Sequence, residues 1–421
     1  MESKKQIQKA ICPLPWMSLS FNTDSSVRVC CNTDHGGFVK NGSEKVFLDD
    51  ISSLQDIADS DTMKSLKANM LGGVRSDFCK SCYAVEDAGG MSVRQYYVKK
   101  YHDEIERILT DKFSGRASSM KFIDFSLSNN CNLKCRMCSP GASYGLSADF
   151  KAIGMDYSSE SAERAHSGWK YDGLIRNIVE DKASDLSDIL FTGGEPLTNP
   201  IHLKILEALT ENGRSKHVAL SYHSNLMILP DHVLDLWKLF KKVDVHLSLE
   251  GNANYNDYIR HKSDFQKIIA NLEKLFSYRK KSKLWIEIHT VFQAYNFLIL
   301  PEYLEYLKQF EKDIPCFPHF IWIDNPDFLS VNSLPPDVKL SGAQALNAYL
   351  DENEKFYKKC SHPEFVSEKI GILRACLARM NYSEDKNSLE KFKVYTEKLD
   401  RLRGQNVAEV FPALKGVFSQ L

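Results

Sequence analysis

The sequence has almost no excess of charge of either sign. Its 421 residues contain 54 Lys and Arg against 55 Asp and Glu, which gives a formal net charge of −1. Proteins that bind nucleic acid or anionic membrane surfaces usually carry a basic excess, because both partners are polyanionic. We therefore expect no nucleic-acid partner and no membrane partner.

Long apolar runs are also missing. No stretch approaches the roughly 18 apolar residues that a membrane-spanning helix needs, and the first residues, MESKKQIQKAICPLPW, contain no apolar core of a secretory signal. The sequence thus predicts a cytoplasmic protein. In a reducing compartment its 11 cysteines are expected to bind metal or carry redox chemistry rather than form disulfides.

The cysteines are concentrated in the first third of the chain. Three of them form the pattern CxxxCxxC in SLSNNCNLKCRMCSP, and no fourth cysteine is near enough to complete a local site. Three thiolates on a [4Fe–4S] cluster would leave one iron open to chelate a small molecule. Zinc sites usually combine two CxxC pairs, so zinc or purely structural cysteines are the weaker alternatives. The three residues are Cys131, Cys135 and Cys138.

Short apolar runs alternate with amphipathic helical patterns from about residue 120 onward, which indicates parallel βαβ units. The expected fold is α/β, a partial (β/α)6 TIM-like barrel over residues 116–335. A cysteine-rich module over 1–115 would precede it and a helical appendage over 336–421 would follow. The six expected strands are MKFIDFSLS (120–128), SDILFTGG (187–194), KHVALSYHSN (216–225), KVDVHLSLEG (242–251), LWIEIHTVF (284–292) and HFIWIDNP (319–326).

With CxxxCxxC after the first expected strand and GGEP after the second, the sequence resembles the radical S-adenosylmethionine (SAM) superfamily. The resemblance implies that Cys131, Cys135 and Cys138 hold a [4Fe–4S] cluster that binds SAM. It also implies an electron donor such as a flavodoxin or ferredoxin. The backbone of the GGEP segment would receive the methionyl amino group, since glycines permit close approach to a ligand. That segment is Gly193, Gly194, Glu195 and Pro196.

Other residues at expected strand ends match the family less specifically. Arg260 is similar to an arginine that relatives aim at the cofactor carboxylate, and two residues of the fifth-strand segment resemble those beside adenine. The remaining matches could equally cap the following helices. The predicted cofactor contacts are Ser224, Asn225, Ser248, Glu250, Arg260, Val291 and Asn296.

The amino-terminal cysteines resemble the auxiliary-cluster modules called SPASM and twitch domains, with Ser25 where those modules have glycine. In these relatives the module usually follows the barrel, whereas here it would precede it. The resemblance implies a second [4Fe–4S] cluster, with zinc as the alternative. Its four ligands would be Cys12, Cys30, Cys79 and Cys82, although the sequence leaves open whether Cys30 or Cys31 is the ligand.

The resemblance implies reductive cleavage of SAM to a 5′-deoxyadenosyl radical that abstracts hydrogen from a small-molecule or peptide substrate. A fully ligated second cluster would act as an electron acceptor, which favours a net oxidation. One alternative is a radical epimerase that uses a cysteine as hydrogen donor, with Cys31 as the catalytic candidate. The other is a nonenzymatic zinc or iron–sulfur protein.

Overall fold

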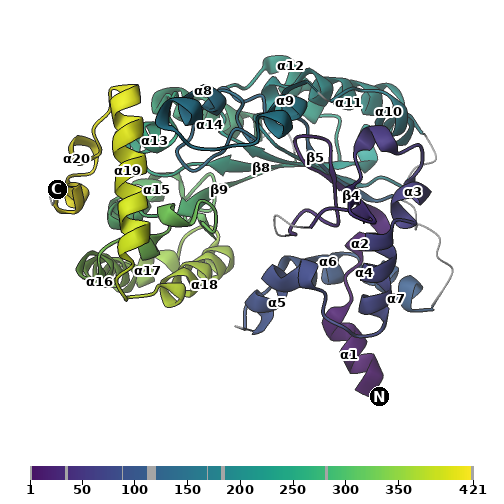
Figure 1. The fold of residues 1–421 in the computed structure, drawn as a ribbon, viewed down its shortest axis with the longest axis horizontal. Coiled ribbons are helices and arrows are strands. Elements are labelled where there is room, and N and C mark those ends of the chain that lie inside the picture. The colour runs from purple at the N-terminus through teal and green to yellow at the C-terminus, as the bar shows by residue number, and fades with distance from the viewer. Residues whose placement is uncertain are drawn as a thin grey trace. The chain divides into compact units, whose positions relative to one another are not determined.

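A computed structural model describes residues 2–33, 37–87, 89–110, 120–167, 169–181, 185–279 and 283–418 (Figure 1). Its main sheet has eight strands, is mostly parallel, and follows the order β10-β9-β8-β7-β6-β5-β1-β2. The α/β class predicted from the sequence is confirmed. The strands are β1 (Ser18–Phe21), β2 (Val27–Arg28), β5 (Phe122–Ser126), β6 (Asp188–Thr192), β7 (Ala219–Ser224), β8 (Lys242–Ser248), β9 (Leu284–Phe292) and β10 (His319–Trp322).

Each of the six expected strands forms within the apolar run that predicts it. In β8, Val243, Val245 and Leu247 are buried, while the residues between them are half-buried or exposed. This period of two sends apolar side chains to one face of the sheet and polar ones to the other. The polar face of these strands carries most of the chemistry described below.

The chain divides into two compact units that are interleaved along the sequence. The first comprises Met1–Asn129, Glu160–Ser221 and Asp235–Lys241. Here β1 runs parallel to β5, with Ser18 opposite Phe122, and β2 pairs antiparallel with β1. The amino-terminal segment thus supplies strands beside the first predicted barrel strand. A separate hairpin joins β3 (Lys40–Asn41) to β4 (Glu44–Lys45).

The helices of the first unit precede and follow these strands along the chain. Pro200 opens α11 and Gly213, at φ +74°, follows its end, as the Asn-Gly stop signal predicts. The helices are α1 (Glu2–Ala10), α2 (Leu14–Met17), α3 (Leu54–Ala58), α4 (Asp61–Leu71), α5 (Lys80–Asp87), α6 (Val93–Lys100), α7 (His102–Thr110), α9 (Ser159–Ser167), α10 (Gly173–Glu180) and α11 (Pro200–Glu211).

The second unit comprises Asn130–Ser159, Tyr222–Leu234 and Lys242–Leu421, and contains β8, β9 and β10. The predicted helical carboxy-terminal region is confirmed. Its helices are α8 (Leu146–Ile153), α13 (Ala253–Ile259), α14 (Phe265–Arg279), α15 (Leu300–Leu307), α16 (Pro336–Glu352), α17 (Glu354–Tyr357), α18 (Pro363–Arg379), α19 (Lys386–Arg403), α20 (Val407–Val410) and α21 (Lys415–Phe418).

Three of the described elements contribute to both units: α9, through its first residue, β7 and α12 (Asp231–Trp237). The predicted domain boundary after residue 115 lies outside the described residues, and the one before residue 336 coincides with the first residue of α16. Among the described residues, no helix combines the length and apolar character needed to cross a bilayer.

Candidate active site

The CxxxCxxC loop lies in the second unit, ahead of α8. Its backbone folds back on the cysteines: the amide of Leu133 donates to Cys131 Sγ at 3.4 Å, and the amide of Cys138 donates to the Cys135 carbonyl at 3.1 Å. The thiol of Cys138 interacts electrostatically with the other two thiols. Three sulfurs therefore converge on one side of a short loop, the donor set that an iron–sulfur cluster with one open iron requires.

A buried cation faces this loop. Arg260 donates from Nη2 to Glu250 Oε1 at 2.6 Å, and its Nη1 lies 3.8 Å from Cys135 Sγ. A hydrogen bond from Cys138, opposed by burial and assisted by Arg260, lowers the pKa of Cys135 to about 7. Arg260 Nε is buried and has no hydrogen-bond partner among the described residues. An unsatisfied buried donor beside three thiols fits a bound group that accepts a hydrogen bond there.

Glu250 holds this arginine in place. It is fully buried and also accepts from the amide of Val291 at 2.9 Å and from Gln293 Nε2 at 3.4 Å. Burial raises its pKa, while the neighbouring guanidinium of Arg260 opposes that rise. Both carboxylate oxygens are thus engaged within the protein. The direct cofactor contact predicted for Glu250 stays a prediction, whereas its positioning of Arg260 is observed.

Asn225 links the end of β7 to the cysteine loop. Its Nδ2 donates to Asn132 Oδ1 at 2.9 Å and lies 3.9 Å from Cys131 Sγ, and its Oδ1 accepts from the amide of Met227 at 2.9 Å. Ser224 has a local role, because its Oγ accepts from the amide of Leu226 at 3.0 Å. Leu226 has a φ of +54°, so Ser224 stabilises a left-handed turn.

The remaining predicted cofactor residues of the second unit lie at the ends of β8 and β9. Asn296 Nδ2 donates to the carbonyls of Val291 at 2.9 Å and Glu250 at 3.1 Å, so it connects the loops that follow these strands. Ser248 and Val291 are half-buried on the polar face of the sheet. Their predicted contacts with the cofactor stay predictions.

The GGEP segment belongs to the first unit and is fastened to the chain leaving β5. Gly193 has a φ of +100°, and a Cβ there would lie 2.9 Å from the Ser128 carbonyl oxygen. The amide of Gly194 donates to that same oxygen at 2.7 Å. Glu195 is buried, and its side chain accepts from the amide of Leu197 at 3.2 Å. Position 193 therefore requires glycine because the backbone of Ser126 and Ser128 leaves no room for a Cβ.

The auxiliary cysteines, also in the first unit, come from four separate local structures. Cys12 precedes α2, Cys30 follows β2, Cys79 ends a 3₁₀ turn and Cys82 lies in α5. The thiol of Cys12 interacts electrostatically with the other three. Burial raises the pKa of Cys30 to about 12 and that of Cys79 to about 11. A bound cation would reverse this effect, since metal coordination deprotonates thiols.

Cys31 has different surroundings from Cys30. Burial raises its pKa, and its thiol also interacts with Cys30, Asp124, Arg28 and Cys12. Asp124 lies on β5, where it accepts from Ser20 Oγ at 2.6 Å and burial raises its pKa to about 6. Cys31 thus approaches the polar face of the sheet in the first unit, whereas the interactions of Cys30 run to Cys79 and Cys82.

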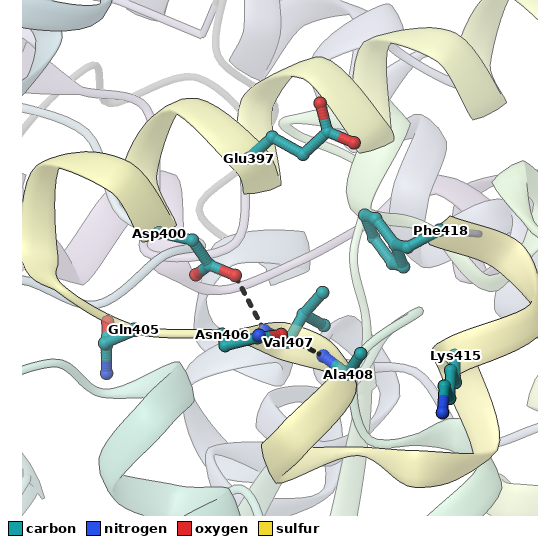
Figure 2. A pocket seen from close by; sticks show the side chains of 8 residues that line it. All are labelled: Glu397, Asp400, Gln405, Asn406, Val407, Ala408, Lys415 and Phe418. Atoms are coloured by element: carbon teal, nitrogen blue, oxygen red, sulfur yellow. Dashed lines mark hydrogen bonds between the residues drawn. The ribbon is translucent and has the colours of Figure 1, made fainter. Parts of the chain in front are cut away.

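A pocket of about 390 Å³ lies elsewhere in the second unit and includes none of the predicted site residues. It is lined by residues of α19 and of the segment after it (Figure 2). Figure 2 shows Asp400 directed at the backbone of Val407, whose amide donates to Asp400 Oδ2 at 2.7 Å. The lining of this pocket includes neither the convergent thiols nor the buried cation found at the cysteine loop, so we place the candidate active site at that loop.

Sequence reasoning missed a set of histidines in the second unit. One histidine occurs in each of four successive strand patterns, SYHSN, DVHLS, IEIHT and PHFI. The signal in the sequence was one histidine in each of four successive strands, at positions that direct all four side chains to the same face of the sheet. These residues are His223, His246, His289 and His319.

Comparison with known proteins points to the same superfamily as the CxxxCxxC loop does. The family model of the radical SAM superfamily matches residues 125–293. GTP 3′,8-cyclase of Synechocystis sp. (strain ATCC 27184 / PCC 6803 / Kazusa) is 27% identical over 212 residues, which cover 50% of this chain and 56% of the cyclase. The chain thus spans little more than half the length of this relative.

Two solved structures resemble the chain more distantly. The structure of anSMEcpe with bound AdoMet and the Cp18Cys peptide is 18% identical, covering 57% of this chain and 62% of its own, with a TM-score of 0.39. SuiB of Streptococcus suis bound to S-adenosylmethionine is 12% identical, covering 71% and 61%, with a TM-score of 0.37. At these TM-scores neither bears on the substrate. The segment that matches the radical SAM superfamily, residues 125–293, thus contains the three convergent thiols.

Proposed function

We propose that this enzyme cleaves SAM reductively and removes hydrogen from a small-molecule or peptide substrate in a net oxidation. The observation that carries the proposal is the convergence of Cys131, Cys135 and Cys138 beside a buried arginine with an unsatisfied Nε. A [4Fe–4S] cluster with bound SAM, once reduced, supplies a 5′-deoxyadenosyl radical that abstracts the hydrogen atom.

The protein's own residues have defined tasks in this proposal. The three cysteines ligate three irons and leave the fourth for SAM. Arg260, oriented by Glu250, offers its unsatisfied donor to the cofactor carboxylate, because a guanidinium suits a carboxylate. Ser248, Val291, Asn225 and Asn296 contact the ribose and adenine. The GGEP backbone, Gly193, Gly194, Glu195 and Pro196, receives the methionyl amino group.

The auxiliary cysteines support an oxidative outcome. The mutual interactions of Cys12, Cys30, Cys79 and Cys82 favour one site with four thiolate ligands, and they favour Cys30 over Cys31 as the ligand. A [4Fe–4S] cluster with four protein ligands has no open iron, so it would accept the electron left on the substrate rather than bind the substrate. Zinc remains the alternative occupant of this site.

The surroundings of Cys31 favour a second candidate function. Its thiol interacts with Asp124, which faces the polar side of β5, whereas the thiol of Cys30 interacts with Cys79 and Cys82. A thiol that is no cluster ligand can give its hydrogen atom to a carbon radical. The product would then be an epimer of the substrate, and one electron from the flavodoxin or ferredoxin donor with a proton from solvent would restore the thiol from its thiyl radical. The auxiliary site would have no oxidative role.

The comparison with a named relative supports one substrate class over the other. The relative of 27% identity is, by its name, an enzyme that acts on GTP, a small molecule. This supports a small-molecule substrate over a peptide for the present chain. An electron donor such as a flavodoxin or ferredoxin would reduce the SAM cluster.

Two variants separate the candidate functions. Cys79→Ala with Cys82→Ala should abolish the oxidised product, yet 5′-deoxyadenosine should still form, because that step needs only the barrel cluster and a reductant. Cys31→Ala should leave the oxidised product unchanged. If the double variant gives normal product while Cys31→Ala gives none, the net oxidation is wrong and the epimerase is supported. Product analysis by mass spectrometry, with solvent deuterium incorporation, makes the distinction.

A further inference from the structure

Four neighbouring strands, β7 to β10, each place a histidine on the same face of the sheet, and all four histidines belong to the second unit. Within the sheet, His319 of β10 lies opposite His289 of β9, and His246 of β8 lies opposite Glu287 of β9. The imidazole rings of His246 and His289 have centroids 4.6 Å apart, and that of His223 lies 4.8 Å from His246 and 5.1 Å from His289. The rings form a compact group across adjacent strands.

Glu287 lies at the centre of this group. Its Oε1 is 2.7 Å from His246 Nδ1 and 2.7 Å from His289 Nε2. The side chains of Glu287 and His289 are each 11% exposed, and that of His246 is 19% exposed. His289 Nδ1 is buried and has no partner within the described part of the chain. A carboxylate shared by two imidazoles is therefore held in a largely dehydrated setting.

The donor atoms of this group suit a metal ion. Imidazole nitrogens and carboxylate oxygens coordinate divalent cations, and Glu287 Oε1 already lies 2.7 Å from a nitrogen of each of the two imidazoles.

We propose that His246, Glu287 and His289 form a binding site for a divalent transition metal of the zinc class. One ligand atom from each lies within 4.8 Å of the others. A tetrahedral site with bonds of about 2.0–2.1 Å separates its ligand atoms by roughly 3.3 Å. The two contacts of 2.7 Å therefore need to open by about half an ångström.

The ring of His223 lies beside those of His246 and His289 and offers a further nitrogen donor. The ring of His319 is 4.8 Å from that of His289 but is engaged by Lys369, whose Nζ lies 3.1 Å from His319 Nδ1. Two histidines and a carboxylate, with at least one position open, form a donor set that binds zinc and iron(II). The open position would accept an oxygen or nitrogen donor from a substrate. Ser248 and Val291 occupy the same sheet face, each two residues further along its strand than a proposed ligand.

The alternative to a metal site is a purely structural network, in which Glu287 only accepts hydrogen bonds from His246 and His289. Such a network would be satisfied without metal and would bind none. Metal affinity therefore distinguishes the two, and it can be measured without SAM or substrate. The inference is thus independent of the proposed radical chemistry.

The test is zinc binding to the full-length protein after its iron–sulfur clusters have been reconstituted anaerobically. We expect His246→Ala with His289→Ala to bind one zinc equivalent fewer than the wild type. Loss of second-shell partners alone costs about 10–100-fold in metal affinity, so Glu287→Gln should weaken binding by at least about 100-fold. His232→Ala, an exposed histidine of α12, should bind as the wild type does.

The difference in zinc content between variants is unaffected by zinc held at the cysteines, because those sites are unchanged. Cluster absorbance serves as the folding control for each variant. Glu287→Gln preserves the shape of the side chain and one acceptor oxygen, so it remains informative if the double variant fails to fold. Equal zinc content in Glu287→Gln and the wild type, or no zinc beyond the cysteine sites in the wild type, would overturn the proposal.

Discussion

Arg136, between the second and third cysteines of the CxxxCxxC loop, donates from Nη2 to Asp400 Oδ1 at 2.5 Å, although 264 residues separate them. Arg136 is fully buried, and its guanidinium lies 3.7 Å from the ring centroid of Tyr258. Its carbonyl accepts from the hydroxyl of Tyr395 at 2.7 Å. Helix α19, which contributes Asp400 and Tyr395, thus holds the loop that would bind the catalytic cluster.

Removing one partner of this pair should be costly. Arg136→Met would leave the buried Asp400 carboxylate without its cation, and breaking a buried pair costs about 3–5 kcal/mol of unfolding free energy. Asp400→Leu in the same chain should recover part of that loss. Urea unfolding measures both effects.

The exposed pair Lys358–Glu354, with side chains 69% and 61% exposed, provides the control. Solvent screens such a pair, so Glu354→Gln should change the unfolding free energy far less than Arg136→Met does. Equal effects of Arg136→Met and Glu354→Gln would mean that α19 does not support the cysteine loop.

Gly193 should tolerate no side chain. Gly193→Ala would add strain at φ +100° and bring a Cβ to 2.9 Å from the Ser128 oxygen. Gly213, at φ +74°, isolates the strain alone, because a Cβ added there would meet no atom within 4 Å. We expect Gly213→Ala to cost about 1–2 kcal/mol and Gly193→Ala to cost about 1–3 kcal/mol more. Thermal unfolding measures the stability of both variants, and an equal loss of stability in the two would contradict this expectation.

Ser25 occupies a conformation that favours glycine. It has a φ of +65°, it is buried, and its Oγ has no hydrogen-bond partner within the described residues. Left-handed non-glycine residues store about 1–3 kcal/mol of strain, so Ser25→Gly should raise the unfolding free energy by about 1 kcal/mol. Ser43→Gly, at an exposed position without positive φ, should not stabilise. A stabilising Ser43→Gly together with a neutral Ser25→Gly would refute the assignment of strain.

Asp124 should make stability depend on pH in an unusual direction. Burial raises its pKa from 3.8 to about 6, so the folded state holds its proton more tightly than the unfolded chain does. Its ionisation therefore destabilises the fold increasingly as pH rises from about 4 to 6. Asp124→Asn lacks this penalty and should gain up to about 3 kcal/mol relative to the wild type across that range.

Asp56 provides a control of opposite sign. Hydrogen bonds from the backbone and side chains of Ser52 and Ser53 lower its pKa to about 2. Its contribution is thus present above pH 4 and lost below it, so Asp56→Asn should show no relative gain between pH 4 and 6. A relative gain for Asp56→Asn, or none for Asp124→Asn, would contradict the burial of an ionisable Asp124.

The sequence predicted what depends on local pattern and left unseen what depends on pairing across the chain. Six strands follow from short apolar runs, and the cysteine spacing indicates a cluster because CxxxCxxC ligands lie on one loop. The parallel pairing of Ser18 with Phe122, in contrast, joins segments whose separation carries no local signal. The pairing of Arg260 with Glu250 is similarly tertiary. The histidine group required knowing that β7, β8, β9 and β10 are neighbours in that order.

The central claim is that Cys131, Cys135 and Cys138 alone hold the cluster that cleaves SAM. The most direct measurement is 5′-deoxyadenosine formation by anaerobically reduced protein, taken together with its iron content. We expect about eight irons and steady formation for the wild type, and about four irons with no 5′-deoxyadenosine when all three cysteines are alanine. Formation of 5′-deoxyadenosine by that triple variant would contradict it.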